Sequence, residues 1–210
     1  MNTSTCFSSK LRLWEAALFL AFGLTLTVGV WASASESALA DQVLRLHVVA
    51  NSDSDSDQAR KLLVRDAVLA EASQLLEGVS DRKGAEAALS PHLEELAQAG
   101  TEALARTGRA DPVTVALADQ WFPTKEYDGF SLPAGQYRAL KVTIGEGRGR
   151  NWWCVVFPPL CAAASAEVPE AALAAGLAPS QVGLITEEDS GYVLKSKLVE
   201  FWGELQAKLG

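Results

Sequence analysis

The sequence is short of positive charge and of complete catalytic motifs, and each shortage excludes a class of function. Its 210 residues hold 18 Lys and Arg against 26 Asp and Glu, a formal net charge of -8. Proteins that bind nucleic acid through its phosphates usually carry a basic patch or stripe. We therefore expect no nucleic acid as a partner, and acidic lipid surfaces are disfavoured by the same argument.

Three short motifs suggest chemistry but lack its remaining parts. Residues 53–57 read Asp-x-Asp-x-Asp, without the Gly and Glu that a calcium loop places at positions six and twelve. The Gly-x-Gly-x-Gly at 145–149 precedes another strand rather than a helix, unlike a phosphate-binding loop. The Asp-Ser-Gly at 189–191 has no second copy, which aspartic proteases need. Neither His-Glu-x-x-His nor Gly-x-Ser-x-Gly occurs. We expect no metal, no cofactor and no catalytic centre.

An apolar run from Ala16 to Ala34 follows Lys10 and Arg12 near the N-terminus. Signal peptides have apolar regions of roughly 7 to 15 residues, whereas membrane-spanning helices need about 20. The run fits either a cleaved signal or an anchor over residues 16–34, and small-x-small cleavage sites occur at 32–34 and 38–40. In both cases the rest of the chain is exported. We predict a signal peptide or anchor over 1–40 and one exported domain over 41–210, with the membrane contacted only through the former.

Strands are predicted where β-branched and aromatic residues alternate with polar ones. The run over 152–157 is apolar throughout, which suits a central strand buried on both faces. Residues 145–151, with three glycines, are predicted to be a hairpin loop. The predicted strands cover residues 43–50, 113–117, 137–144, 152–157 and 182–185.

Helices are predicted from apolar residues at helical spacing and from capping signals. Pro91 cannot lie inside a helix, so Ser90 and Pro91 are read as the N-cap and first position of a new one. The predicted helices cover residues 55–77, 81–107 with this interruption, 169–175 and 192–209. The fold class is α/β or α+β: a small mixed sheet, two to three helices after the first strand, and a C-terminal amphipathic helix.

Two cysteines of the exported part lie close together. Cys154 and Cys161 bracket a short segment with two prolines, and such a pair can form a disulfide in an oxidising compartment. A buried thiol on an apolar strand is equally ordinary, so both states stay open. Cys154 could also act as a nucleophile with His47 as its base, provided that the fold brings the two side chains together.

The most distinctive segment is the tryptophan-rich run that begins at Asn151. Trp152 and Trp153 are adjacent, so they must face opposite sides of a strand. Aromatic residues and arginine are enriched in binding hot spots. The predicted partner surface comprises Arg148, Arg150, Asn151, Trp152, Trp153, Pro158 and Pro159.

Several motifs together resemble the stage II sporulation protein R family. They lie at 46–53, 57–59, 64–69, 132–137, 144–147, 151–154, 157–161 and 197–200. The resemblance covers nearly all of residues 41–210 and includes the exported N-terminus.

The resemblance implies a signalling protein rather than an enzyme. Members of this family are exported from the forespore into the space between forespore and mother cell. There they activate a membrane-embedded aspartic protease, the stage II sporulation GA protein, which processes the sigma-E precursor in the mother cell. Two alternatives remain at this point: a cell-envelope hydrolase that uses Cys154 or His47, and a structural envelope module.

Overall fold

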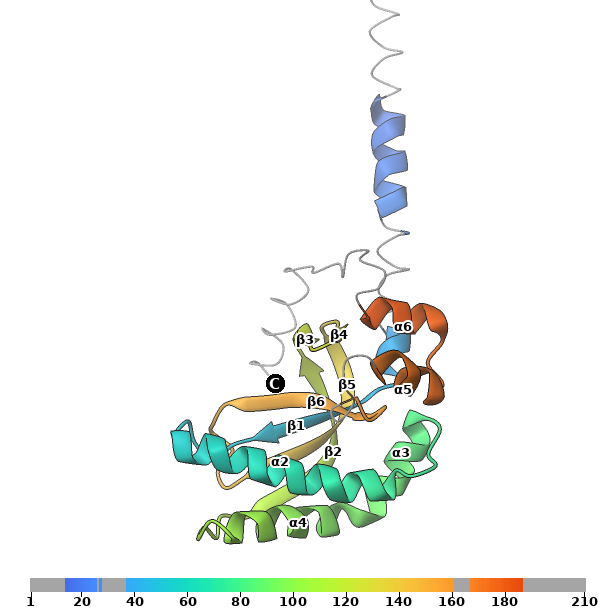
Figure 1. The fold of residues 1–210 in the computed structure, drawn as a ribbon. Helices are drawn as coiled ribbons and strands as arrows, with labels where there is room; N and C mark the ends of the chain where they lie inside the picture. The colour runs from blue at the N-terminus through green and yellow to red at the C-terminus, as the bar shows by residue number, and fades with distance from the viewer. Residues whose placement is uncertain (1–13, 26, 28–36, 161–166, 187–210) are drawn as a thin grey trace, which may run out of the picture. The chain divides into compact units, whose positions relative to one another are not determined.

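The computed structural model describes residues 14–25, 27, 37–160 and 167–186 (Figure 1). The chain divides into two compact units, residues 1–38 and 39–210. In the first, residues 14–25 form a helix whose large apolar side chains are exposed. Among the described residues, no helix combines the length and apolar character needed to cross a bilayer. The signal peptide or anchor over 16–34 stays a prediction.

The second unit is built on a four-stranded mixed sheet. Its strands are β1 (Leu44–Val49), β2 (Val113–Phe122), β5 (Gly135–Ile144) and β6 (Asn151–Phe157), in the order β2-β5-β1-β6. β1 runs parallel to β5 and antiparallel to β6, whereas β2 runs antiparallel to β5. The small mixed sheet and its helices confirm the predicted fold class.

The order of the strands corrects two predictions. β6 is the outermost described strand on its side of the sheet, and the central strands are β1 and β5. An outer strand can still be apolar throughout, because side-chain layers cover both faces of this one: Val155 packs on one side and Val156 on the other. The segment 145–150 is not a hairpin, because β1 lies between the two strands that it connects.

Three helical segments follow β1, as expected. α2 (Asp55–Leu75) is capped by Ser54, whose hydroxyl accepts a hydrogen bond from the backbone N–H of Asp57. α3 (Arg82–Leu89) and α4 (Leu93–Ala105) are separated by the 3-10 turn η1 (Ser90–His92). The prediction of Ser90 as N-cap and Pro91 as first position is wrong: Ser90 follows α3 directly as the first residue of η1, and Pro91 is the second.

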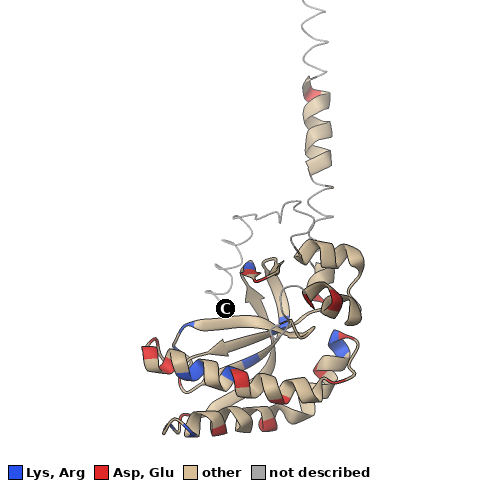
Figure 2. Cartoon of the chain, viewed as in Figure 1, with Lys and Arg blue, Asp and Glu red and all other residues tan. Residues whose placement is uncertain are grey.

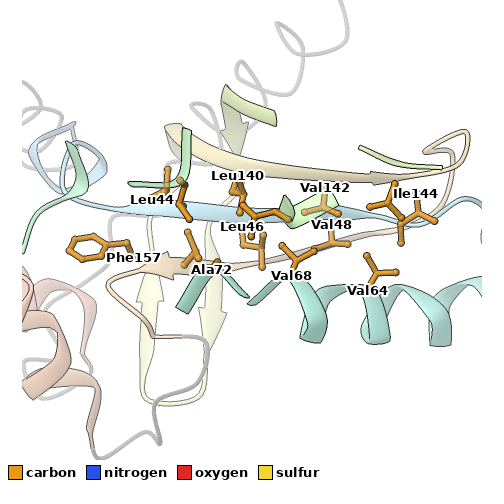
Figure 3. Close-up of a cluster of buried hydrophobic side chains, with 14 of the residues drawn as sticks. Leu44, Leu46, Val48, Val64, Val68, Ala72, Leu140, Val142, Ile144 and Phe157 are labelled. Atoms are coloured by element: carbon orange, nitrogen blue, oxygen red, sulfur yellow. The ribbon is translucent and has the colours of Figure 1, made fainter. Parts of the chain in front are cut away.

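One face of the sheet packs against α2 and α4 (Figure 1). Alternate residues of the central strands point into this layer, where they meet one side of α2 (Figure 3). The cluster includes Leu44, Leu46 and Val48 of β1, Leu140, Val142 and Ile144 of β5, and Val64, Val68 and Ala72 of α2.

A second cluster covers part of the other face. It gathers Phe122, Tyr137 and Val155 of the sheet with the hairpin of β3 (Lys125–Tyr127) and β4 (Phe130–Leu132). α5 (Val168–Ala174) and α6 (Pro179–Ile185) complete it.

α5 confirms the helix expected at 169–175, but the strand expected at 182–185 is wrong. Those residues belong to α6, which starts at Pro179, and the Gln181 side chain accepts from the backbone N–H of Ala178. These N-terminal signals outweigh the β-branched residues that follow. The helix predicted over 192–209 lies outside the described residues.

Candidate functional site

The turn after β1 and the loop before β6 interlock, and we call this contact the clasp (residues 50–53 and 145–150). The side-chain oxygen of Asn51 accepts from the N–H of Glu146 at 3.1 Å, and its backbone oxygen accepts from the N–H of Arg148 at 3.2 Å. The N–H of Arg150 donates to Asp53 at 2.7 Å. The loop thus crosses the end of β1 and is hydrogen-bonded to the turn that follows β1.

The glycines of this loop allow the close approach. Gly145 has φ +56°, and a Cβ there would collide with the side chain of Asn51. A Cβ at Gly149 would meet the backbone oxygen of Ser52. Because the loop's amides donate within the chain, the repeat of glycines serves packing and not the binding of an anion.

Asp57, at the start of α2, holds the turn of the clasp in place. Its carboxylate accepts from Ser52 Oγ at 2.6 Å, from Asn51 Nδ2 at 2.9 Å and from Arg60 Nη1 at 3.1 Å. These hydrogen bonds, that of Ser52 first, lower the pKa of Asp57 from 3.8 to about 2. The Asp-x-Asp-x-Asp run is therefore a helix start with one structural carboxylate.

Lys61 joins α2 to the other half of the clasp. Its ammonium group is buried and donates to Gln58 Oε1 at 2.8 Å and to the backbone oxygen of Arg150 at 3.0 Å. Burial lowers the pKa of Lys61. This role could not be predicted from the sequence, because Lys61 lies on a helix with several charged residues and its partner is 89 positions away.

Trp152 faces the helices, beside the clasp. The guanidinium of Arg65 in α2 lies 4.6 Å from the ring centre, a cation–π contact that was not expected from the sequence. The ring also packs against the edge of the main hydrophobic cluster. Trp152 is half-buried, with contacts to α2 and to the main cluster.

Trp153 faces the opposite side of the sheet, which confirms that the two tryptophans diverge. Its ring lies 6.1 Å from that of His47 and 6.3 Å from that of Phe122. His47 makes hydrogen bonds with Gln120 at 2.7 Å and Asn151 at 2.9 Å. Burial lowers the pKa of His47 below 6.5, so the ring is neutral near pH 7.

Arg45 lies on the same face as His47 and is fully buried. Its guanidinium lies 4.2 Å from the ring centre of Phe122 and 4.9 Å from that of Tyr137, and it donates to Tyr127 Oη at 2.6 Å. Burial lowers the pKa of Arg45. The contact with Tyr127 attaches the β3–β4 hairpin to the sheet.

The predicted partner surface does not form one patch. Arg148, Arg150 and Asn151 are exposed at the clasp, and Arg148 pairs with Glu146 at 3.1 Å while Arg150 lies 3.7 Å from Asp53. The clasp is thus not a cluster of unpaired positive charge. Pro158, buried, and Pro159, exposed, lie beyond the opposite end of β6.

His47 and Cys154 do not meet. In the register of β1 and β6, Leu46 lies opposite Cys154 and His47 lies opposite Trp153. Neighbouring residues point to opposite faces of a sheet, so the imidazole and the sulfur are separated by it. Cys154 is moreover disulfide-bonded, and the other half of the bond lies outside the described residues. Its pairing with Cys161 stays a prediction.

Comparison with known proteins identifies relatives of the part that contains the clasp. The family model described as stage II sporulation protein R matches residues 40–167. The chain is 40% identical over 121 residues to the stage II sporulation protein R of Bacillus subtilis (strain 168). This match covers 58% of this chain and 54% of the relative, about half of its length. No solved structure matches.

Proposed function

The chain belongs to the stage II sporulation protein R family, and on this premise we propose that it is an exported signalling protein of sporulation. In this proposal it leaves the forespore, enters the space between forespore and mother cell, and activates a membrane-embedded aspartic protease, the stage II sporulation GA protein. That protease then processes the sigma-E precursor in the mother cell.

The observation that carries the proposal is the position of Trp152 beside the clasp, half-buried and in contact with Arg65. The loop that leads into β6 donates hydrogen bonds to Asn51 and Asp53 and accepts one from Lys61, and the guanidinium of Arg65 lies against the indole. A side chain that is already ordered loses little conformational entropy when a partner binds. The clasp with Trp152 is therefore suited to protein recognition.

Activation follows if the chain binds the active state of the protease more tightly than its inactive state. A ligand shifts a conformational equilibrium only by this difference in affinity. Docking of the clasp and Trp152 on the outer part of the protease would then favour the active, dimeric state.

The test is processing of the sigma-E precursor in a heterologous host that exports this chain and makes the protease. Trp152→Ala, Trp153→Ala and Arg148→Ala are introduced one at a time, with Lys125→Ala, at an exposed position of β3, as the control. We expect Trp152→Ala and Arg148→Ala to lower processing, and Lys125→Ala to leave it unchanged. If every folded variant still triggers processing, the proposed surface is wrong.

The two alternatives give different results in the same host. A structural envelope module would hold a complex together without switching on cleavage of the precursor. A hydrolase that used Cys154 would lose its activity in Cys154→Ala, but the separation of His47 and Cys154 by the sheet removes the geometric basis for such a pair. We expect the Cys154→Ala variant, provided that it folds, to trigger processing of the precursor.

A further inference from the structure

The outer edge of β2 is long and regular, and no strand of the described residues pairs with it. Its ten residues pair with β5 without a register shift, from Val113 opposite Ile144 to Phe122 opposite Gly135. In the part of the chain that the structure describes, β2 pairs with β5 along one edge and with no strand along the other. Half of the backbone N–H and C=O groups of β2 therefore point away from the sheet.

β2 also lacks the features by which proteins usually protect an edge. It contains no Pro, Gly or Lys and no bulge, and it is not short. Its single charged residue, Asp119, pairs with Arg138 of β5 at 3.4 Å. Such an edge is a template for a further strand.

The two faces of β2 define the side chains that an added strand would need. Val115 and Leu117 are half-buried and pack on the helix-side cluster, so the neighbouring positions of an added strand should be apolar. Thr114 and Ala116, on the other face, are small and exposed. Small or polar residues fit beside them.

α4 and β2, with the loop between them, have a net negative charge. α4 leads into β2 and packs against it, since a Cβ on Gly100 of α4 would lie 3.0 Å from Val113. The segment from α4 through β2 holds two guanidinium groups and five carboxylates: Arg106 and Arg109 against Glu94, Glu95, Glu102, Asp111 and Asp119 (Figure 2). Together with the net charge of -8, these carboxylates favour a positively charged strand and disfavour a second copy of this acidic chain.

We infer that the outer edge of β2 binds an extended, positively charged segment of the partner protein as a fifth strand of the sheet. The inference rests on the proposed function, in which that partner is the protease. Main-chain hydrogen bonds along β2 supply the affinity, and the alternating side chains set the register. The clasp and Trp152 then form a second contact with the same partner.

Hydrogen exchange of the β2 amides tests the inference directly. The full chain is mixed with the protease in detergent, and exchange of residues 113–122 is compared with that of the chain alone. In the free chain every second amide, the one that points outwards, should exchange fast; binding should slow this set by at least about tenfold. Binding should also weaken as salt is added.

A proline variant tests the same edge in the signalling assay. Proline replaces Ala118 or Asp119, whichever amide exchanges fast in the free chain, because proline is tolerated in an edge strand when its missing N–H faces solvent. Asp119→Asn serves as the control for the loss of charge. The proline variant should keep its fold and lose processing.

The outcomes separate this inference from the proposed function. If the wild-type chain triggers processing while its β2 amides stay unprotected, or if the folded proline variant triggers as well as wild type, the inference is wrong and the function stands. If protection appears with rising concentration of the chain alone, the occupant is a second copy and the inference is wrong. If the wild-type chain never triggers processing, both the inference and the proposed function are wrong.

Discussion

At the scale of single residues, the clasp depends on the ionised form of Asp57. Its folded-state pKa of about 2 lies below the ordinary value of 3.8, so the unfolded chain binds a proton more readily than the folded chain. The stabilisation is therefore complete above pH 4 and is lost as the pH falls through 2.

Replacing Asp57 by Asn should lower the free energy of unfolding by about 1–3 kcal/mol at pH 7, because three hydrogen bonds to a charged acceptor are weakened. The deficit should shrink as the pH falls to about 2, where half of the wild-type carboxyl groups are protonated. Urea unfolding across this pH range measures both. Asp55→Asn, an exposed neighbour in the same helical turn, should change little; an equal loss in both variants would contradict the role given to Asp57.

Alanine substitutions at two glycines should change the stability of the fold in opposite directions. Gly149→Ala places a Cβ against the backbone oxygen of Ser52, which cannot move without opening the clasp. This substitution should lower the free energy of unfolding by about 1–3 kcal/mol. Gly183→Ala, inside α6 with open space around it, should stabilise by about 0.5–1 kcal/mol. Thermal unfolding of the two variants checks both signs.

At the scale of elements, the clasp loop must cross β1, whereas a hairpin loop need not cross anything. A two-residue Asn-Gly turn in place of residues 145–150 joins neighbouring strands, which are about 4.8 Å apart. β5 and β6 are about twice as far apart, and the connection must also pass around the end of β1, which lies between them. We expect this variant not to fold, as judged by circular dichroism. The control is Asp128→Asn, which makes the same Asn-Gly turn between β3 and β4, a true hairpin; a well-folded loop replacement would contradict the strand order.

The elements also show which parts of the fold can be predicted from sequence. β1, α2 and α5 were predicted close to their observed bounds, because alternation, capping residues and glycine stops are local signals. The strand order was not predictable, since the loop at 145–150 has the composition of a hairpin and its partner, the turn at 50–53, lies almost a hundred residues earlier.

The candidate site was predictable to the same extent. Trp152 and the exposed Arg148 and Asn151 were found by residue type, but Arg65 and Lys61 were missed. Their roles depend on which side of α2 meets β6, and that is decided by the packing of the whole layer. Pro158 and Pro159 were grouped with the site only because they are close in sequence.

At the scale of the whole molecule, the second unit contains its own hydrophobic clusters. Both clusters draw on residues from Leu39 onwards, and Leu39 and Val43 are themselves buried. Residues 39 and 40 therefore belong to the folded unit, although the sequence alone grouped them with the export segment. A cut within residues 32–34 would keep Leu39 in the core, whereas a cut after residue 40 would remove it.

This difference can be measured on two shortened chains. A chain that begins at Leu39 should unfold at the same denaturant concentration as the full chain, because it keeps every side chain of the two clusters. A chain that begins at Asp41 loses the buried Leu39 and should be less stable by about 1.5–3 kcal/mol. Leu39→Ala in the full chain should reproduce most of that loss. If the chain from Asp41 is as stable as the full chain, Leu39 is not part of the core and cleavage at either site is compatible with the fold.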